Sequence, residues 1–100
     1  MVPVTVIPEA ASLLRARLGV EAEQAFVESL AKEEIVVEPM SRVDFKRCAS
    51  LMATYRDIGF VDASVVAIAE RLRLKAIVTT DRRHFSQIRP KHIRAFELLP

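Results

Sequence analysis

The order of the predicted elements in this 100-residue chain indicates an α/β fold built on a short parallel sheet. Segments with apolar residues at helical spacing alternate with short β-branched runs, as expected when helices cover a sheet. The strongest strand candidate, residues 76–79, shows no alternation of polar and apolar side chains. That pattern is typical of a central parallel strand buried on both faces. The length fits a single domain over residues 1–100.

The N-terminal third predicts an extended segment followed by two helices. Valines alternate over residues 2–6, but two prolines confine this segment to a sheet edge or a lead-in. Pro8 is placed to open a helix, with Glu9 in the favourable first turn. Gly19 is expected to end that helix as a C-terminal cap, and a second helix is expected over 21–32.

The next segment predicts a strand and a third helix. Residues 35–37 form a β-branched run that ends before Pro39. Ser41 and Asp44 have the spacing of a capping box and predict a helix over about 41–55. The residues expected to form its apolar face are Phe45, Cys48, Ala49 and Met52.

The C-terminal part predicts a fourth helix and two strands. Asp62 is expected to begin the helix, after a break at 57–59. The residues expected to point inward are Val65, Val66, Ile68, Ala69 and Leu72, and those expected to point outward are Glu70, Arg71 and Arg73. After the strand at 76–79 and a turn at 82–85, a last strand is expected over 95–99.

The composition excludes several classes of protein. Cys48 is the only cysteine, so one chain can form neither a disulfide framework nor a thiolate metal cluster. Its neighbours suggest a small buried core residue. No run approaches the roughly 20 apolar residues that span a membrane, and the N-terminus lacks a signal-peptide pattern. We therefore expect a cytoplasmic protein.

The charge is distributed unevenly along the chain. Residues 1–70 carry 7 Lys/Arg against 11 Asp/Glu, whereas residues 71–100 carry 8 against 2. A basic region of this kind can contact phosphate groups. The same charges can also belong to a solvated face or to a surface that docks an acidic partner. Charge alone leaves these interpretations open.

Three acidic residues occupy special places in the predicted order. Glu9 and Asp62 lie in helix first turns, and Asp81 follows the strongest strand. Strand carboxyl ends and helix first turns meet at one edge of a parallel sheet. Converging carboxylates there suit Mg²⁺ or Mn²⁺, which can activate water for attack on a phosphodiester. Singly, each acid is explained as well by a helix dipole, a cap or a turn, which leaves the metal site a minority hypothesis.

Residues 59–85 resemble the C-terminal signature of VapC-type PIN domains. In that family a helix that begins with Asp-Ala-Ser, here residues 62–64, is followed by a hydrophobic strand. A turn then follows, here Thr-Thr-Asp-Arg-Arg-His-Phe at residues 79–85. Residues 9–19 are similar to the family helix that carries an acidic residue at its start. The resemblance covers essentially the whole chain.

The resemblance implies a PIN-like α/β/α sandwich and a metal-dependent endoribonuclease, the toxin of a toxin–antitoxin pair. By residue matching, Glu9, Asp62 and Asp81 hold Mg²⁺ or Mn²⁺, which activates water to cleave RNA. Thr79 is expected to support these carboxylates with its hydroxyl. The residues expected to steer the RNA backbone are Arg82, Arg83, Arg89, Lys91 and Arg94. The partners implied are RNA, an antitoxin protein and a second copy in a homodimer.

The sequence departs from the family pattern at its beginning. Family members open with a central strand that ends in an Asp-Thr-Ser-like motif and supplies the first acid of the pocket. We expect this strand and this ligand to be absent from residues 1–100, leaving an open slot that invites pairing with another chain. A misassigned start, a truncated relative and a different use of residues 2–7 each explain the departure. The alternative function is a catalytically impaired module that binds an antitoxin or self-associates.

Overall fold

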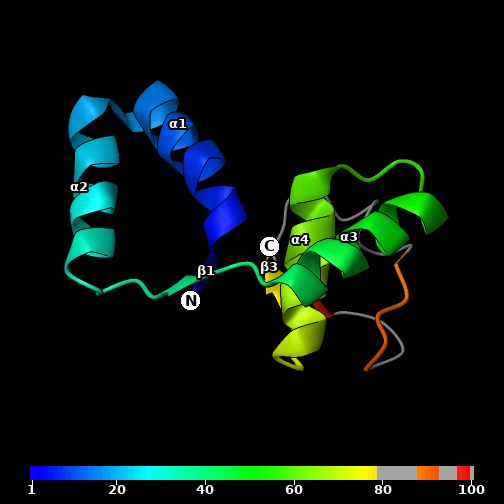
Figure 1. The fold of residues 1–100 in the computed structure, drawn as a ribbon. Helices are drawn as coiled ribbons and strands as arrows, with labels where there is room; N and C mark the ends of the chain where they lie inside the picture. The colour runs from blue at the N-terminus through cyan, green and yellow to red at the C-terminus, as the bar shows by residue number, and fades with distance from the viewer. Residues whose placement is uncertain (79–87, 93–96, 100) are drawn as a thin grey trace. The chain divides into compact units, whose positions relative to one another are not determined.

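The computed structural model of the chain describes residues 1–78, 88–92 and 97–99. They divide into two compact units, Met1–Met40 (unit 1) and Ser41–Pro100 (unit 2). Within these residues, each unit contains two α-helices and one pair of parallel strands (Figure 1). The predicted α/β order and parallel strand direction are therefore confirmed. Among the described residues the strands form two separate two-stranded sheets.

Unit 1 is a helical hairpin with a strand at each end. Its elements are β1 (Val2–Pro3), the 3₁₀ helix η1 (Val4–Val6), α1 (Ile7–Leu18), α2 (Val20–Ala31) and β2 (Val37–Glu38). β1 runs parallel to β2, with Val2 opposite Val37 and Pro3 opposite Glu38. The Val2 N–H also donates a hydrogen bond of 2.8 Å to the Val36 carbonyl. The helical hairpin is thus the connection between two parallel neighbours.

The predicted extended segment at residues 2–6 is strand over only two residues. From Val4 onward the chain is helical, first as η1 and then as α1. Pro8 is compatible with this because the first N–H groups of a helix have no intrahelical acceptor, so the missing N–H of proline costs nothing there. The helix therefore begins one residue before Pro8 rather than at it.

Gly19 joins α1 to α2. Its φ of +99° and ψ of 175° lie in a backbone region that essentially only glycine adopts. Its N–H donates a hydrogen bond of 3.1 Å to the Arg15 carbonyl, which satisfies an acceptor in the last turn of α1. The predicted C-terminal cap is confirmed, and the chain turns into α2 at this single residue (Figure 1).

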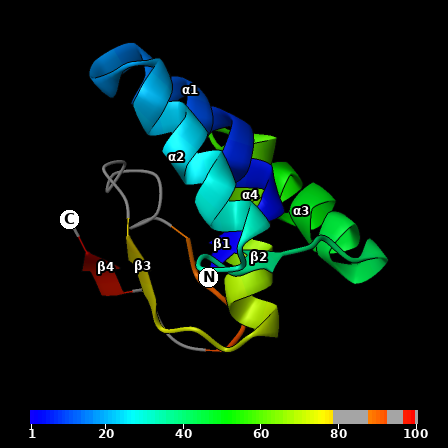
Figure 2. The same cartoon turned by 90° about the vertical axis from the view of Figure 1, so that its left-hand side faces the viewer.

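Unit 2 holds two packed helices and the second strand pair (Figure 2). Its elements are α3 (Arg42–Thr54), α4 (Phe60–Arg71), β3 (Ala76–Val78) and β4 (Glu97–Leu99). β3 pairs with β4 in parallel from Ala76 opposite Glu97. The predicted capping box is confirmed at α3, because Ser41 N donates to Asp44 Oδ2 at 3.0 Å and Asp44 N donates to Ser41 Oγ at 3.2 Å.

The buried core of the described residues lies in unit 2. Its apolar members are Cys48, Leu51, Ile58, Ala63, Val66, Ala67, Ile68, Ala69 and Ile88. The predicted burial of Cys48 is confirmed, and burial, reinforced by the negative charge of Asp44, raises the pKa of its thiol. No residue of α1 or α2 is buried. None of the described helices combines the length and apolarity that a bilayer crossing requires.

The predicted apolar face of α3 is buried only at Cys48, whereas Phe45, Ala49 and Met52 are exposed. The residues that α3 buries are Asp44, Cys48 and Leu51, which follow a spacing of four and then three residues. Phe45 and Met52 each follow a buried residue by one position, about 100° further around the helix, and both are exposed. Leu72, expected inward at the end of α4, is also exposed. The buried Asp44 shifts the inward stripe, because it is held there by polar partners.

Candidate functional site

Asp62 lies in a firmly packed helix start in unit 2. It is the third residue of α4 and half-buried, and the helix begins two residues earlier than the sequence predicted. Ala63 and Ser64, which follow it, are fully buried. The Ser64 hydroxyl donates to the Val61 carbonyl at 2.5 Å. The small residues of the Asp-Ala-Ser motif thus let the first turn pack closely and fix the backbone that carries Asp62.

Glu9 occupies the equivalent position in unit 1. It is the third residue of α1, follows Pro8 and is exposed. Both acids therefore lie in the first turn of a helix, where unsatisfied N–H groups and the helix dipole favour negative charge. Two of the three predicted acids have the predicted helical setting. Among the residues that the structure describes, no group of three His, Cys, Asp or Glu side chains is placed to hold a metal ion.

Several predicted site residues lie outside the described residues. They are Thr79, Asp81, Arg82, Arg83 and Arg94. Of the residues predicted to contact RNA, Arg89 and Lys91 are described and both are exposed. They belong to the segment 88–92.

The segment 88–92 is fastened to the helices of unit 2. The Arg89 N–H donates to the Tyr55 hydroxyl at 2.9 Å, and the Lys91 N–H donates to Glu70 Oε2 at 2.8 Å. His92 Nε2 lies 2.5 Å from the Leu74 carbonyl. Three contacts thus anchor this basic segment to the residue that caps α3, to the end of α4 and to the turn after α4.

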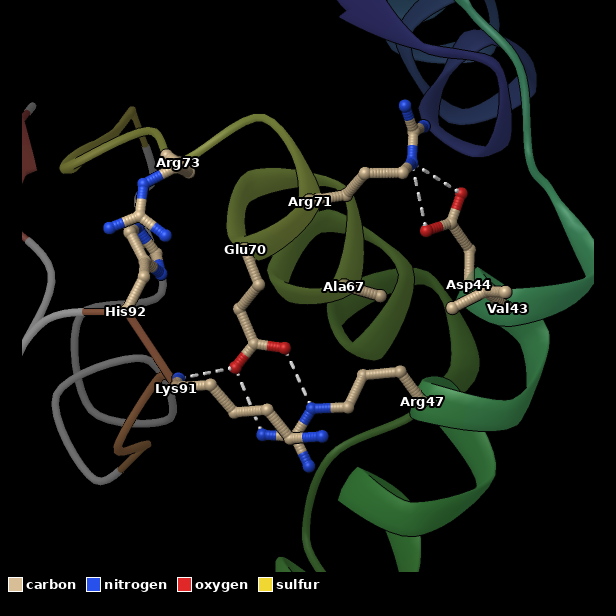
Figure 3. A pocket seen from close by; sticks show the side chains of 9 residues that line it. All are labelled: Val43, Asp44, Arg47, Ala67, Glu70, Arg71, Arg73, Lys91 and His92. Carbon is tan, nitrogen blue, oxygen red and sulfur yellow. Dashed lines mark hydrogen bonds and ion pairs between the residues drawn. The ribbon is translucent and has the colours of Figure 1, made fainter.

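A pocket of about 280 Å³ opens between α3, the end of α4 and residues 91–92 (Figure 3). Its lining residues are Val43, Asp44, Arg47, Ala67, Glu70, Arg71, Arg73, Lys91 and His92. Glu70 and Arg71 are the last two residues of α4, whereas Asp62 is in its first turn. At 1.5 Å per residue the pocket therefore lies roughly 12 Å along the helix from Asp62. The pocket and the predicted metal ligand are at opposite ends of α4.

Two ion pairs between α3 and α4 line this pocket (Figure 3). Arg47 Nε donates to Glu70 Oε1 at 2.7 Å, and its Nη2 donates to Oε2 at 2.9 Å. Arg71 Nε lies 3.1 Å from each carboxylate oxygen of Asp44. The expectation that Glu70 points outward is wrong, since its side chain is 8% exposed. Ion pairing makes this burial possible.

The ion pairs set the protonation of both acids. Burial alone raises the pKa of Asp44, but the hydrogen bonds from Arg71 and Ser41 outweigh it, and the pKa lies below its ordinary value. Burial likewise raises the pKa of Glu70, and the hydrogen bonds from Arg47 and from the Lys91 N–H outweigh it. Both carboxylates are ionised and satisfied by cationic donors. They hold unit 2 together and are poor candidates for metal ligands.

The model of the PIN domain family matches residues 1–90, nearly the whole chain. The chain belongs to the PIN domain family. A similar protein is "Ribonuclease VapC26" of Mycobacterium tuberculosis (strain ATCC 25618 / H37Rv). The two are 35% identical over 97 residues, which cover 95% of this chain and 72% of that protein. The resemblance inferred from the sequence motifs is confirmed.

Sequence reasoning about this PIN domain missed the polar network between α3 and α4. A signal for it exists in the spacing of residues. Glu70 follows Val66 by four positions and Ala67 by three, so it shares the face of two buried residues. Asp44 precedes Cys48 by four positions in the same way. An acid at such a position requires a cationic partner from the facing helix.

Proposed function

We propose that this PIN domain is a metal-dependent endoribonuclease, the toxin of a toxin–antitoxin pair. The observation that carries the proposal is the family match over residues 1–90, a range that includes Glu9, Asp62 and Asp81. Glu9 and Asp62 also share the third position of their helices. The similarity to a protein named as a ribonuclease supports RNA as the substrate.

The proposed ligands are chemically suited to Mg²⁺ or Mn²⁺. Glu9, Asp62 and Asp81 offer only carboxylate oxygens, the donors that hard divalent cations prefer. Such a cation, when bound, lowers the pKa of a water molecule and stabilises negative charge on phosphoryl oxygens. Glu9 and Asp62 lie in the first turns of α1 and α4, where the helix dipole favours negative charge. The Thr79 hydroxyl would orient a neighbouring carboxylate.

The proposed RNA contacts come from the basic C-terminal part of the chain. Arg82, Arg83 and Arg89 would bind the phosphate backbone, because guanidinium groups match phosphate oxygens in geometry and charge. Arg89 is exposed, and its N–H donates a hydrogen bond to the Tyr55 hydroxyl. Binding through these arginines should weaken as the salt concentration rises.

The test is cleavage of an end-labelled single-stranded RNA by the purified chain. We expect cleavage with Mg²⁺ or Mn²⁺, none with EDTA, and a loss of about 100-fold or more for Asp62→Asn. The matched control is Asp57→Asn, which removes an exposed carboxylate three residues before the start of α4 and should cleave like the wild type. Equal cleavage by Asp62→Asn, or cleavage in EDTA, would contradict the proposed mechanism.

A second candidate is a catalytically impaired module that binds an antitoxin or self-associates. The observation in its favour is the helical hairpin of unit 1, which buries none of its residues. Four of its large apolar side chains are at least half exposed, namely Leu13, Leu18, Val20 and Val27. Exposed apolar surface of this kind is typical of protein interfaces. If the chain cleaves RNA in a metal-dependent way and Asp62→Asn abolishes this cleavage, the impaired module is excluded. If the chain does not cleave RNA but forms a stable complex in sedimentation, the impaired module is favoured.

A further inference from the structure

Two phenylalanine rings lie stacked on the surface of unit 2. Phe45 of α3 and Phe60, the first residue of α4, have ring centroids 6.0 Å apart and ring planes within 3° of parallel. Both are large apolar side chains, yet Phe45 is 53% exposed and Phe60 is 40% exposed. We call this pair the aromatic platform.

The core does not explain the aromatic platform. The inward stripe of α3 is Asp44, Cys48 and Leu51, and Phe45 lies about 100° away from it. Burial of one phenylalanine contributes about 1.5–3 kcal/mol to folding, and much of this contribution is missing at both rings. The rings nevertheless hold one another in a fixed parallel arrangement, because each is carried by a packed helix. The result is a pair of exposed aromatic rings with parallel planes.

The surroundings of the platform are cationic. Arg42 lies three positions before Phe45 and so on the same side of α3, and Lys46 follows Phe45 directly. Both cations are exposed, and neither has an acidic partner among the described residues.

These features match single-stranded nucleic acid better than a protein partner. Aromatic faces beside unpaired cations are the shared design of proteins that bind single strands, since bases stack on the rings while cations meet the phosphates. A symmetric contact with a second copy would bring Arg42 and Lys46 toward their own equivalents, which is unfavourable. An acidic peptide would satisfy the cations but would leave the parallel rings unused.

We propose that Phe45 and Phe60 form a stacking platform for a base of single-stranded RNA, with Arg42 and Lys46 contacting the adjoining phosphates. The proposal rests on the proposed function for its substrate class. The platform positions the strand; it takes no part in bond cleavage. Because every base has an aromatic face, the platform binds RNA with little sequence preference.

The test is the binding of a 5′-fluorescein 10-nucleotide single-stranded RNA in EDTA, followed by anisotropy. Its partner ligand is an abasic ribose-phosphate oligomer of the same length. In the double variant Phe45→Leu/Phe60→Leu we expect RNA to bind about 5–150-fold more weakly, since stacking contributes roughly 1–3 kcal/mol per base. Binding of the abasic oligomer should not change. Val43→Ala, which trims another exposed apolar side chain of α3, is the control and should leave both affinities unchanged.

Two further variants separate stacking from folding and from charge. Phe45→Tyr/Phe60→Tyr keeps the ring faces and should bind RNA like the wild type. If the rings serve only in packing, the tyrosine and leucine variants should bind RNA with the same affinity. Arg42→Gln/Lys46→Gln should reduce the slope of log affinity against log salt by about 1.4, or 0.7 for each lost phosphate contact. Wild-type circular dichroism in each variant ensures that binding is compared between folded proteins.

Several outcomes would overturn the platform. One is wild-type affinity of the leucine variant for RNA, and another is an equal loss for RNA and for the abasic oligomer. A third is a leucine variant that changes the sedimentation coefficient without changing RNA affinity, which would assign the rings to a protein contact. Stacking-dependent binding without any metal-dependent cleavage would instead support the platform and refute the nuclease proposal. The two proposals therefore fail separately.

Discussion

Arg47 of α3 donates two parallel hydrogen bonds to Glu70 of α4, from Nε to Oε1 at 2.7 Å and from Nη2 to Oε2 at 2.9 Å. Both side chains are largely shielded from solvent, with 18% of Arg47 and 8% of Glu70 exposed. The Lys91 N–H donates a third hydrogen bond to Glu70. One carboxylate thus joins α3, α4 and the basic segment 88–92, so its loss should affect all three.

Removing one partner of this ion pair should destabilise the fold. We expect Glu70→Ala to lower the free energy of unfolding by about 3 kcal/mol, because it leaves a shielded guanidinium without its counter-charge. The double variant Arg47→Met/Glu70→Leu removes both charges and keeps most of the volume, so it should recover much of that loss. Urea denaturation followed by circular dichroism measures each value.

The matched control is the exposed pair Arg15–Glu23, whose N–O distance is 2.9 Å and whose side chains are 60% and 25% exposed. Its removal by Glu23→Ala should change stability by no more than about 1 kcal/mol, since solvent screens the charges. A Glu70→Ala effect as small as that of Glu23→Ala would show that shielding from solvent does not strengthen the Arg47–Glu70 ion pair.

The two acids of the pocket should make the fold sensitive to acid. The pKa values of Asp44 and Glu70 are both lowered in the folded chain, since hydrogen bonds from Arg71 and Arg47 outweigh the effect of burial. A lowered folded-state pKa means that the ionised form favours folding. The contribution is complete above the unfolded-state pKa, about 4, and is lost as the pH falls through the folded-state values.

We therefore expect the free energy of unfolding to fall steeply below about pH 4. The variant Asp44→Asn/Glu70→Gln should be less stable at neutral pH and should lose less stability on acidification, because it lacks the two titrating groups. Urea denaturation at a series of pH values measures both curves. If the variant loses as much stability on acidification as the wild type, other groups control the acid response.

The sequence predicted the elements of the fold well and their buried faces less well. The local geometry at Gly19 and at the Ser41–Asp44 capping box could be predicted directly from the sequence. Few residue types adopt a positive φ, and few side chains cap a helix N-terminus. Whether Phe45 or Asp44 faces inward depends instead on a partner from another helix, Arg71, which lies 27 residues away. Apolarity alone favours Phe45 and so gives the wrong stripe.

The sequence likewise predicted the local features of the candidate site better than its long-range geometry. Glu9 and Asp62 were predicted from local patterns, and both occupy the helix first turns that those patterns describe. Their convergence with Asp81 on one cation is a statement about long-range geometry and stays a prediction. The aromatic platform could not be predicted, because Phe45 and Phe60 are 15 positions apart and are brought together only by the packing of α3 on α4.

The backbone at Gly19 should not tolerate a side chain. Its φ of +99° lies in a region where a Cβ atom is strained, although an added Cβ would meet only Glu21 Oε2, at 3.6 Å. We expect Gly19→Ala to cost about 2 kcal/mol through backbone strain alone. Gly59→Ala is the control, since Gly59 has a φ of −91° and nothing within 4 Å of an added Cβ. Equal effects of the two substitutions on thermal unfolding would contradict this account.

Metal binding should stabilise the chain through Asp62. Any ligand that binds only the folded state raises the free energy of unfolding, by about 2.7 kcal/mol at a free concentration 100 times its Kd. We therefore expect saturable Mn²⁺ binding in calorimetry and a higher Tm in Mn²⁺ than in EDTA. Asp62→Asn and Asp81→Asn should each weaken Mn²⁺ binding at least tenfold, whereas Asp57→Asn should leave it unchanged. This readout needs no RNA. If Asp62→Asn binds Mn²⁺ with wild-type affinity, Asp62 is not a metal ligand, and the chemistry proposed for the first turn of α4 is wrong.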